Sequence, residues 1–200
     1  MNPDYMDFGT KFSNHFNMNV EWFELYGDVK EDIMYNTPSA YRKPVDITIY
    51  VDAEHANENI TRRSHIGILI FFHSAPTMWY SKQQDTIDSS NFWSGVVSLG
   101  TDIYIIKIMR YNLWMMGVPL IGSACVFWNN NSIINGVLIP ELNITNKSFF
   151  ICHHAVRKAS AKGLWWVGFV KGKHNNAYFL TKILSVAAIE KQFYIWMYKA

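Results

Sequence analysis

Short apolar runs separated by polar turns occupy the middle of the chain, and they predict its first strands. The segment ITIYVDA (47–53) is β-branched and apolar until it reaches an acid, and IGILIFF (66–72) is a second apolar run. Both patterns are typical of buried β-strands. A turn at 74–76 leads into a third short strand, TMWYS (77–81). Three consecutive strands with short connections predict an antiparallel meander.

The second half of the chain alternates between helical and strand patterns. Apolar residues recur at spacings of three to six between Val97 and Met116, which predicts a long helix over 89–116. Gly117 and Pro119 end this helix. The other elements predicted here are strands at 124–128 and 164–170 and helices at 132–138, 147–162 and 177–198. Alternation of this kind places parallel strands beside the antiparallel ones.

Together these elements predict an α/β fold with a mixed five-stranded sheet flanked by helices. Three antiparallel strands come first and parallel strands follow. Residues 1–45 are a mixed segment with prolines at 38 and 44, which we interpret as a connector or leader that enters a domain at 46–200. A chain of 200 residues is long enough for one domain of this kind plus an extension.

The composition indicates a folded protein and gives little information about its partners. Half of the residues are hydrophobic and 16% are aromatic, which supports a sizeable core and excludes a disordered chain. The net charge of +2 is too small to predict a polyanionic partner, so a nucleic-acid site requires local clustering of basic residues. The two cysteines do not form a CxxC motif and predict neither a zinc site nor a disulfide framework.

No segment has the pattern of a signal peptide or a membrane span. The N-terminal residues lack a basic region followed by an apolar one. Residues 111–140 carry no charge, but Gly117, Pro119 and Gly122 interrupt them. A spanning helix needs about 20 mostly apolar residues in one piece. We therefore expect a cytoplasmic or nuclear protein without a membrane partner.

Five segments follow one another in the order and at the spacing of a known set of motifs. They are YVDAEHANENITRRSHIGILIFF (50–72), MWYSKQQDTIDSS (78–90), VFWNNNSII (126–134), KSFFICHHAVRKA (147–159) and NNAYFLTKIL (175–184). In this order they resemble the ribonuclease H region of copia-type retrotransposon polyproteins, and the last segment resembles the A-D-x-x-T-K signature of that family. The segment WFELYGDVKEDI (22–33) is similar to the leader that precedes this region in one branch, so the resemblance extends over roughly residues 20–195.

The resemblance implies a ribonuclease H-like fold and a parent chemistry, the cleavage of RNA in RNA–DNA hybrids with two magnesium ions. Such ions lie about 4 Å apart and need carboxylate oxygens, and the family supplies about four acids. Only the first acid has a counterpart here, Asp52 at the end of the first strand. The other three positions fall on Gly95, Asn129 and Tyr178. We therefore expect a pseudo-ribonuclease H that binds no cofactor, with Asp52 a vestigial catalytic residue and metal ligand.

Acids close to these positions do not restore the set. Glu54 lies two residues after Asp52 and can point to the same side if the strand continues. Asp102 lies seven residues after Gly95, which is about 10 Å along a helix and too far to replace a missing ligand. One anion in place of about four predicts very weak magnesium binding.

Basic residues supply a candidate nucleic-acid surface. Contacts of lysine, arginine and histidine with phosphates give affinity without sequence readout. The alternative is a solvated basic helix face with no partner. The candidates are Arg62, Arg63, Lys82, His154, Arg157 and Lys158. The partners expected from the resemblance are an RNA–DNA hybrid or another nucleic acid, bound weakly, and other parts of a retrotransposon polyprotein.

Two other functions are compatible with the same residues. One is a non-catalytic module that binds nucleic acid or protein, and the other is a residual metal-dependent nuclease with a rearranged site. A reverse transcriptase is excluded. The stretch YVDA (50–53) resembles the Y-x-D-D of that enzyme but has one aspartate of the two, and too little chain precedes it for a polymerase palm.

Overall fold

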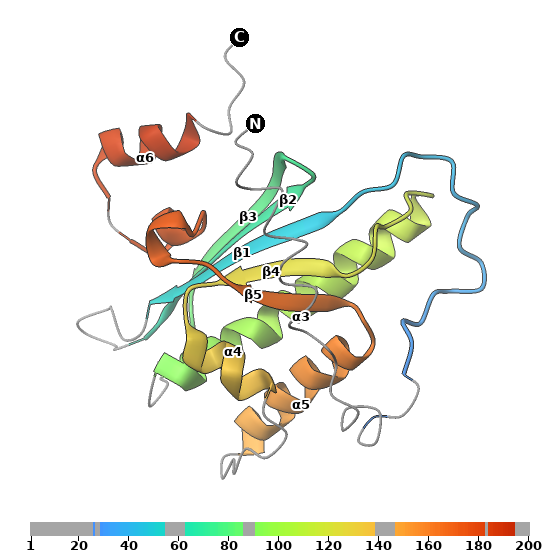
Figure 1. Cartoon of the computed structure of the whole chain (residues 1–200), viewed down its shortest axis with the longest axis horizontal. Helices are drawn as coiled ribbons and strands as arrows, with labels where there is room; N and C mark the ends of the chain where they lie inside the picture. The colour runs from blue at the N-terminus through green and yellow to red at the C-terminus, as the bar shows by residue number, and fades with distance from the viewer. Residues whose placement is uncertain are drawn as a thin grey trace.

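The apolar runs of the sequence form one five-stranded sheet in the computed structural model of the protein (Figure 1). The structure describes residue 26 and the ranges 29–54, 63–85, 91–138, 147–182 and 184–194. The strands are β1 (Ile47–Glu54), β2 (His65–Phe72), β3 (Ala75–Gln83), β4 (Ala124–Trp128) and β5 (Trp165–Phe169). Every predicted strand is present, and its ends lie within two residues of the predicted ones.

The sheet is mixed, as the order of elements predicts. Its strand order is β3-β2-β1-β4-β5. The strand β1 pairs antiparallel with β2, which pairs antiparallel with β3. On its other side β1 pairs parallel with β4, and β4 pairs parallel with β5. The carboxyl ends of β1, β4 and β5 therefore lie at the same edge of the sheet.

The alternation of side chains along β1 separates two cores. Ile47, Ile49 and Val51 belong to the main core, which the sheet shares with the long helix and its neighbours. Tyr50 points to the opposite face, where it belongs to a second cluster with Phe71 and other apolar residues. Because successive strand residues point to opposite faces, Asp52 shares the face of Tyr50. The end of β1 thus presents an acid on the face that carries the smaller cluster.

Three helices cover the face of the main core (Figure 1). They are α3 (Asn91–Met115), α4 (Asn131–Leu138) and α5 (Lys147–Ala161), close to the predicted positions. Gly117 ends α3 in a left-handed conformation with φ of +68°, which glycine adopts without strain. Within the described ranges, none of the helices has the length and apolar character needed to cross a bilayer.

The last part of the chain differs from the prediction of one helix over 177–198. The structure has two short 3-10 turns, η2 (Gly172–His174) and η3 (Tyr178–Leu180), and then α6 (Val186–Phe193). Residues 195–198 of the predicted helix lie outside the described residues. The single helix is wrong because Asn175 anchors the chain to the sheet, donating to the Val51 carbonyl at 2.8 Å. Ser185 then starts a new helix by accepting a hydrogen bond from the Ala188 amide.

The described part of the predicted leader lies against the helical layer. Arg110 of α3 donates two hydrogen bonds to the Glu31 carboxylate, at 2.7 and 2.6 Å. Lys162, just after α5, pairs with Asp32 at 2.6 Å. Val45 forms an isolated bridge with Leu120. Residues 29–45 therefore make specific contacts with the domain they precede, and the boundary at residue 46 stays a prediction.

Candidate functional site

Asp52 lies at the centre of a polar cluster at the carboxyl ends of two parallel strands. Its side chain is 2% exposed. The Asn129 side-chain amide, directly after β4, donates to Asp52 Oδ1 at 2.9 Å. The Thr181 hydroxyl, directly after η3, donates to Asp52 Oδ2 in a short hydrogen bond. Both carboxylate oxygens therefore accept hydrogen bonds from neutral side chains of this chain.

Gly67 allows the 177–181 segment to approach Asp52. It pairs with Asp52 across the β1–β2 ladder and so shares its face of the sheet. A β-carbon at this glycine would lie 2.7 Å from Leu180 Cβ and 2.9 Å from Thr181 Cγ2. These distances are shorter than van der Waals contact, so a larger residue would push Thr181 away from the carboxylate.

A second acid beside Asp52 is held in an ion pair. Lys182 Nζ lies 2.5 Å from Glu54 Oε1, and both side chains are about three-quarters buried. The same ammonium lies 5.7 Å above the ring of Tyr178. The other oxygen of Glu54, Oε2, is buried and has no hydrogen-bond partner among the described residues. The cluster therefore contains two carboxylates and one internal cation.

Burial raises the pKa of Asp52 above its usual value. The hydrogen bond from Thr181, the charge of Lys182 and the hydrogen bond from Asn129 each act in the opposite direction, in that order of size. The charge of Glu54 adds a small further rise to the pKa. The site therefore disfavours a bare carboxylate at Asp52, and internal donors reduce that penalty.

Gly95, the position that the resemblance assigns to a helix acid, has little room for a side chain. A β-carbon built on Gly95 of α3 would lie 1.9 Å from Ile133 Cδ1 and 2.7 Å from Ile133 Cγ1. Ser94, the position given by the neighbouring register, is buried and donates to Gln84 Oε1 at 3.3 Å. Both positions are therefore occupied by packing and hydrogen bonding within the domain.

The residues present do not fit a two-magnesium site. Of the four positions assigned to acids, Asp52 alone carries a carboxyl group, and its oxygens already accept two internal hydrogen bonds. In the part of the chain that the structure describes, no three His, Cys, Asp or Glu side chains gather closely enough to hold a metal ion. Magnesium requires several oxygen ligands in near-octahedral geometry, and this cluster offers few free ones.

Asp102 lies in a different environment, within the helical layer. It is 1% exposed on α3, and neither of its oxygens has a hydrogen-bond partner among the described residues. Burial raises its pKa well above the usual value. The charge of Asp102 acts on Cys152, a free thiol whose own pKa burial raises to about 11. The neutral acid is the form that this environment favours.

The candidate nucleic-acid residues do not form one exposed surface. Arg157 is 3% exposed, so the expectation that it contributes to an exposed basic face of α5 is wrong. The physical reason is helical spacing, because His153, Val156 and Arg157 lie on the inward side of the helix and all three are buried. His154 is partly buried and shares a 3.0 Å hydrogen bond with the Tyr26 hydroxyl.

The remaining candidates are in varied positions. Lys158 is exposed on α5. Lys82 is exposed on β3 and pairs with Asp85 at 3.1 Å. Arg63 is half-buried before β2, and Arg62 lies outside the described residues. Of the five candidates that the structure describes, the two lysines are exposed to solvent.

Comparison with known proteins identifies the fold. No protein-family model and no curated protein matches the sequence. LC11-RNase H1, isolated from compost by a metagenomic approach, aligns with a TM-score of 0.51 at 14% identity, covering 74% of this chain and 98% of that chain. The prototype foamy virus protease–reverse transcriptase aligns with a TM-score of 0.50 at 10% identity, covering 76% of this chain and 23% of that chain.

The fold is ribonuclease H-like. The mixed sheet and the helices that cover it agree with the architecture predicted from the sequence. At these identities the similarity concerns the fold alone, and function has to be argued from the residues of the site.

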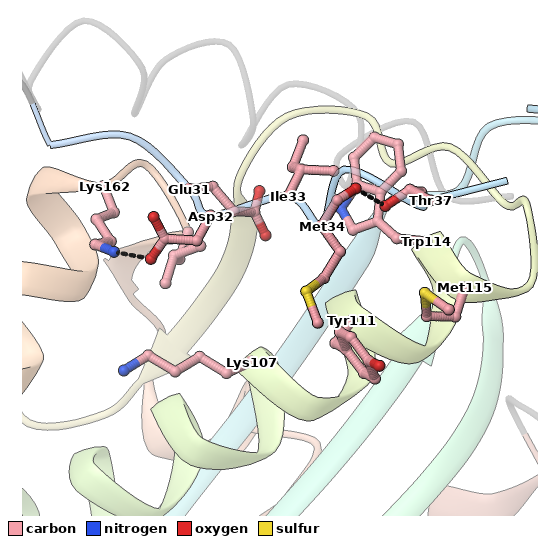
Figure 2. Close-up of a pocket in the computed structure, with 11 residues that line it drawn as sticks. Glu31, Asp32, Ile33, Met34, Thr37, Lys107, Tyr111, Trp114, Met115 and Lys162 are labelled. Carbon is pink, nitrogen blue, oxygen red and sulfur yellow. Dashed lines mark hydrogen bonds and ion pairs between the residues drawn. The ribbon is translucent and has the colours of Figure 1, made fainter. Parts of the chain in front are cut away.

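A cavity of this ribonuclease H-like domain lies away from Asp52. It has a volume of about 250 Å³ and lies between residues 31–37 and the C-terminal half of α3. Figure 2 shows Met34, Tyr111 and Trp114 around it and the ion pair of Lys162 with Asp32 at its side. Leu164, which also lines the cavity, precedes β5, whereas Asp52 lies near the carboxyl end of the parallel strand β1. The cavity and Asp52 therefore lie at opposite ends of the parallel strands.

The sequence prediction does not include Thr181 or Lys182, although both are part of the site. They occupy the T and K of the A-D-x-x-T-K signature in the segment NNAYFLTKIL. That motif is the signal that could have identified them. Their residue types alone could not, because threonine and lysine are common on any polar surface.

Proposed function

We propose that this chain is the degenerate ribonuclease H-like region of a copia-type retrotransposon polyprotein and that it does not cleave RNA–DNA hybrids. The observation that carries the proposal is the state of Asp52, which accepts one hydrogen bond on each oxygen from Asn129 and Thr181. A magnesium ion would have to displace both donors and would find too few further carboxylates.

The packing around the other assigned positions supports the same conclusion. Gly95 has no side chain, and Ile133 fills the space beside it. Asn129 is a neutral amide, and Tyr178 carries a phenol with the Lys182 ammonium above its ring. Glu54, the remaining acid nearby, is neutralised by Lys182. We therefore expect no resident magnesium and no two-metal hydrolysis.

The test is cleavage of a labelled RNA–DNA hybrid in the presence of Mg²⁺ or Mn²⁺. We expect the unaltered chain to give no more product than the isosteric variant Asp52→Asn, while an active ribonuclease H run in parallel digests the substrate. Metal-dependent cleavage that is present in the unaltered chain and absent in Asp52→Asn would contradict the proposal. That result would favour the alternative of a residual nuclease with a rearranged site.

The same preparation tests the alternative of a non-catalytic binding module. Phosphate binding needs exposed cations, and of the described candidates Arg157 is buried and His154 is engaged with Tyr26. Lys82 and Lys158 remain exposed. We therefore propose that any binding of nucleic acid is weak and disappears with added salt. Tight hybrid binding by fluorescence anisotropy at physiological salt would instead favour the binding module.

A further inference from the structure

Two polar side chains meet at the carboxyl ends of neighbouring parallel strands. Asp52 belongs to β1 and Asn129 follows β4, and the two strands pair through registers that end at Val51 and Trp128. The distance from Asn129 Nδ2 to Asp52 Oδ1 is 2.9 Å. An aspartate at position 129 would place two carboxylates at about this separation in a partly buried site, where like charges repel.

We infer that the amide of Asn129 takes the place of a metal cation between positions 52 and 129. The carboxyl ends of β1 and β4 are then stable without a bound metal ion. A cation between two carboxylates supplies positive charge to both, whereas an amide N–H supplies one hydrogen bond directly to the single carboxylate that remains. The inference rests on the proposed function in one respect only, the assignment of position 129 to an acid of the parent family.

The other groups of the site complete this internal neutralisation. Thr181 donates to the second oxygen of Asp52. Lys182 lies 2.5 Å from Glu54 and its charge also favours the ionised form of Asp52. Both oxygens of Asp52 and one oxygen of Glu54 are thus paired with an amide, a hydroxyl and an ammonium that all belong to this chain.

A simpler role for Asn129, as the cap of the following helix, is already filled by its neighbour. The side chain of Asn130 accepts a hydrogen bond from the Ser132 amide at 3.0 Å at the start of α4. The side-chain amide of Asn129 is directed to Asp52 instead. The orientation of Asn129 is therefore explained by its contact with the carboxylate.

The test compares Asn129→Asp with Asn129→Ala by thermal unfolding, in EDTA and in MnCl₂. We expect the unaltered chain to unfold at the same temperature in both. Asn129→Asp should unfold at a lower temperature in EDTA, and Mn²⁺ should raise its midpoint by at least about 3 °C. Asn129→Ala should be destabilised without any response to Mn²⁺, because it removes the donor without adding a carboxylate. Calorimetric titration should show one Mn²⁺ bound per chain for Asn129→Asp and none for the unaltered chain.

A charge-exchanged variant keeps the test decisive if Asn129→Asp fails to fold. In Asp52→Asn/Asn129→Asp, the amide and the carboxylate exchange places. The variant should therefore fold like the unaltered chain, and Mn²⁺ should not change its unfolding temperature. Mn²⁺ binding by the unaltered chain, or equal behaviour of Asn129→Asp and Asn129→Ala, would overturn the inference. Failure of the exchanged variant to fold would also overturn it. Hybrid cleavage by the unaltered chain addresses the proposed function separately.

Discussion

Ile133 occupies the space that a side chain at position 95 would need. A β-carbon on Gly95 would lie 1.9 Å from the terminal methyl of Ile133, well inside van der Waals contact. Ile133 is 1% exposed and belongs to the main core, so it has little room to move. The absence of an acid at position 95 is therefore coupled to the packing of α4 against α3.

We predict that Gly95→Glu destabilises the protein and restores no cleavage. Overpacking of a core typically costs about 1–3 kcal/mol, and here it outweighs the gain of about 1 kcal/mol in helix propensity on removing a glycine. Urea unfolding of Gly95→Ala, Ile133→Ala and the double variant measures the coupling. The double variant should be less destabilised than the sum of the single variants, and strict additivity would contradict the steric explanation.

Asp102 is a second residue whose surroundings determine its behaviour. Its buried carboxyl group has no hydrogen-bond partner among the described residues, and its pKa in the folded protein is raised. The folded state therefore holds a proton on Asp102 that the unfolded chain, with a pKa near 3.9 for aspartate, releases as the pH rises. Stability from this group is fully present below about pH 4 and is lost as the pH increases toward the raised value.

We predict that Asp102→Asn flattens the pH dependence of stability. The unaltered chain should lose free energy of unfolding relative to the variant as the pH rises from about 4 toward the raised pKa of Asp102, since asparagine does not titrate. Denaturant unfolding at several pH values measures the difference, and the contributions of the other acids cancel because both proteins share them. A difference that stays constant across this range would show that Asp102 ionises normally in the folded state.

At the scale of elements, the segment that precedes β1 is joined to α3 and α5 by two ion pairs of different quality. The pair of Glu31 with Arg110 has two hydrogen bonds, and the two side chains are 21% and 6% exposed. The pair of Asp32 with Lys162 has one contact, and Asp32 is 91% exposed. Buried pairs with two hydrogen bonds are far more costly to break than exposed ones.

We predict that Glu31→Gln destabilises the protein by about 1.5–3 kcal/mol, because a charged hydrogen-bonded partner of Arg110 is lost. Asp32→Asn is the matched control at the next residue and should leave the midpoint of urea unfolding unchanged. Equal, non-zero effects of the two substitutions would contradict the argument that burial and a second hydrogen bond make the Glu31 pair the stronger one. A null effect of both would support the interpretation of this segment as a simple connector.

At the scale of the whole molecule, the side chains that form the main core are distinct from those that form the polar site. The buried residues of β1, Ile49 and Val51, point into the main core, while Asp52 points to the other face. Core packing and site chemistry are therefore carried by alternate residues of one strand. This separation explains how a TM-score of 0.51 accompanies only 14% identity with LC11-RNase H1, because many apolar sequences can fill the same core.

The sequence by itself determined the strands, the long helix and the class of fold. Apolar runs such as 47–53 and 66–72 are buried on both faces, and a buried run can be recognised without knowledge of its neighbours. The exception was the segment after β5, where an amphipathic pattern predicts a helix but Asn175 ties the chain to β1. The periodicity of a segment does not show that one of its side chains forms a hydrogen bond with a distant strand.

Only the tertiary structure decided what surrounds Asp52 and which basic residues reach the solvent. Asn129 and Thr181 are 77 and 129 residues away from Asp52 in the chain, and the parallel strands and Gly67 bring them into contact. Arg157 was a surface candidate by its charge and is buried by its place on α5. Hydrogen bonds and burial depend on which segments come together in the folded chain. Local sequence patterns do not show which distant segments those are.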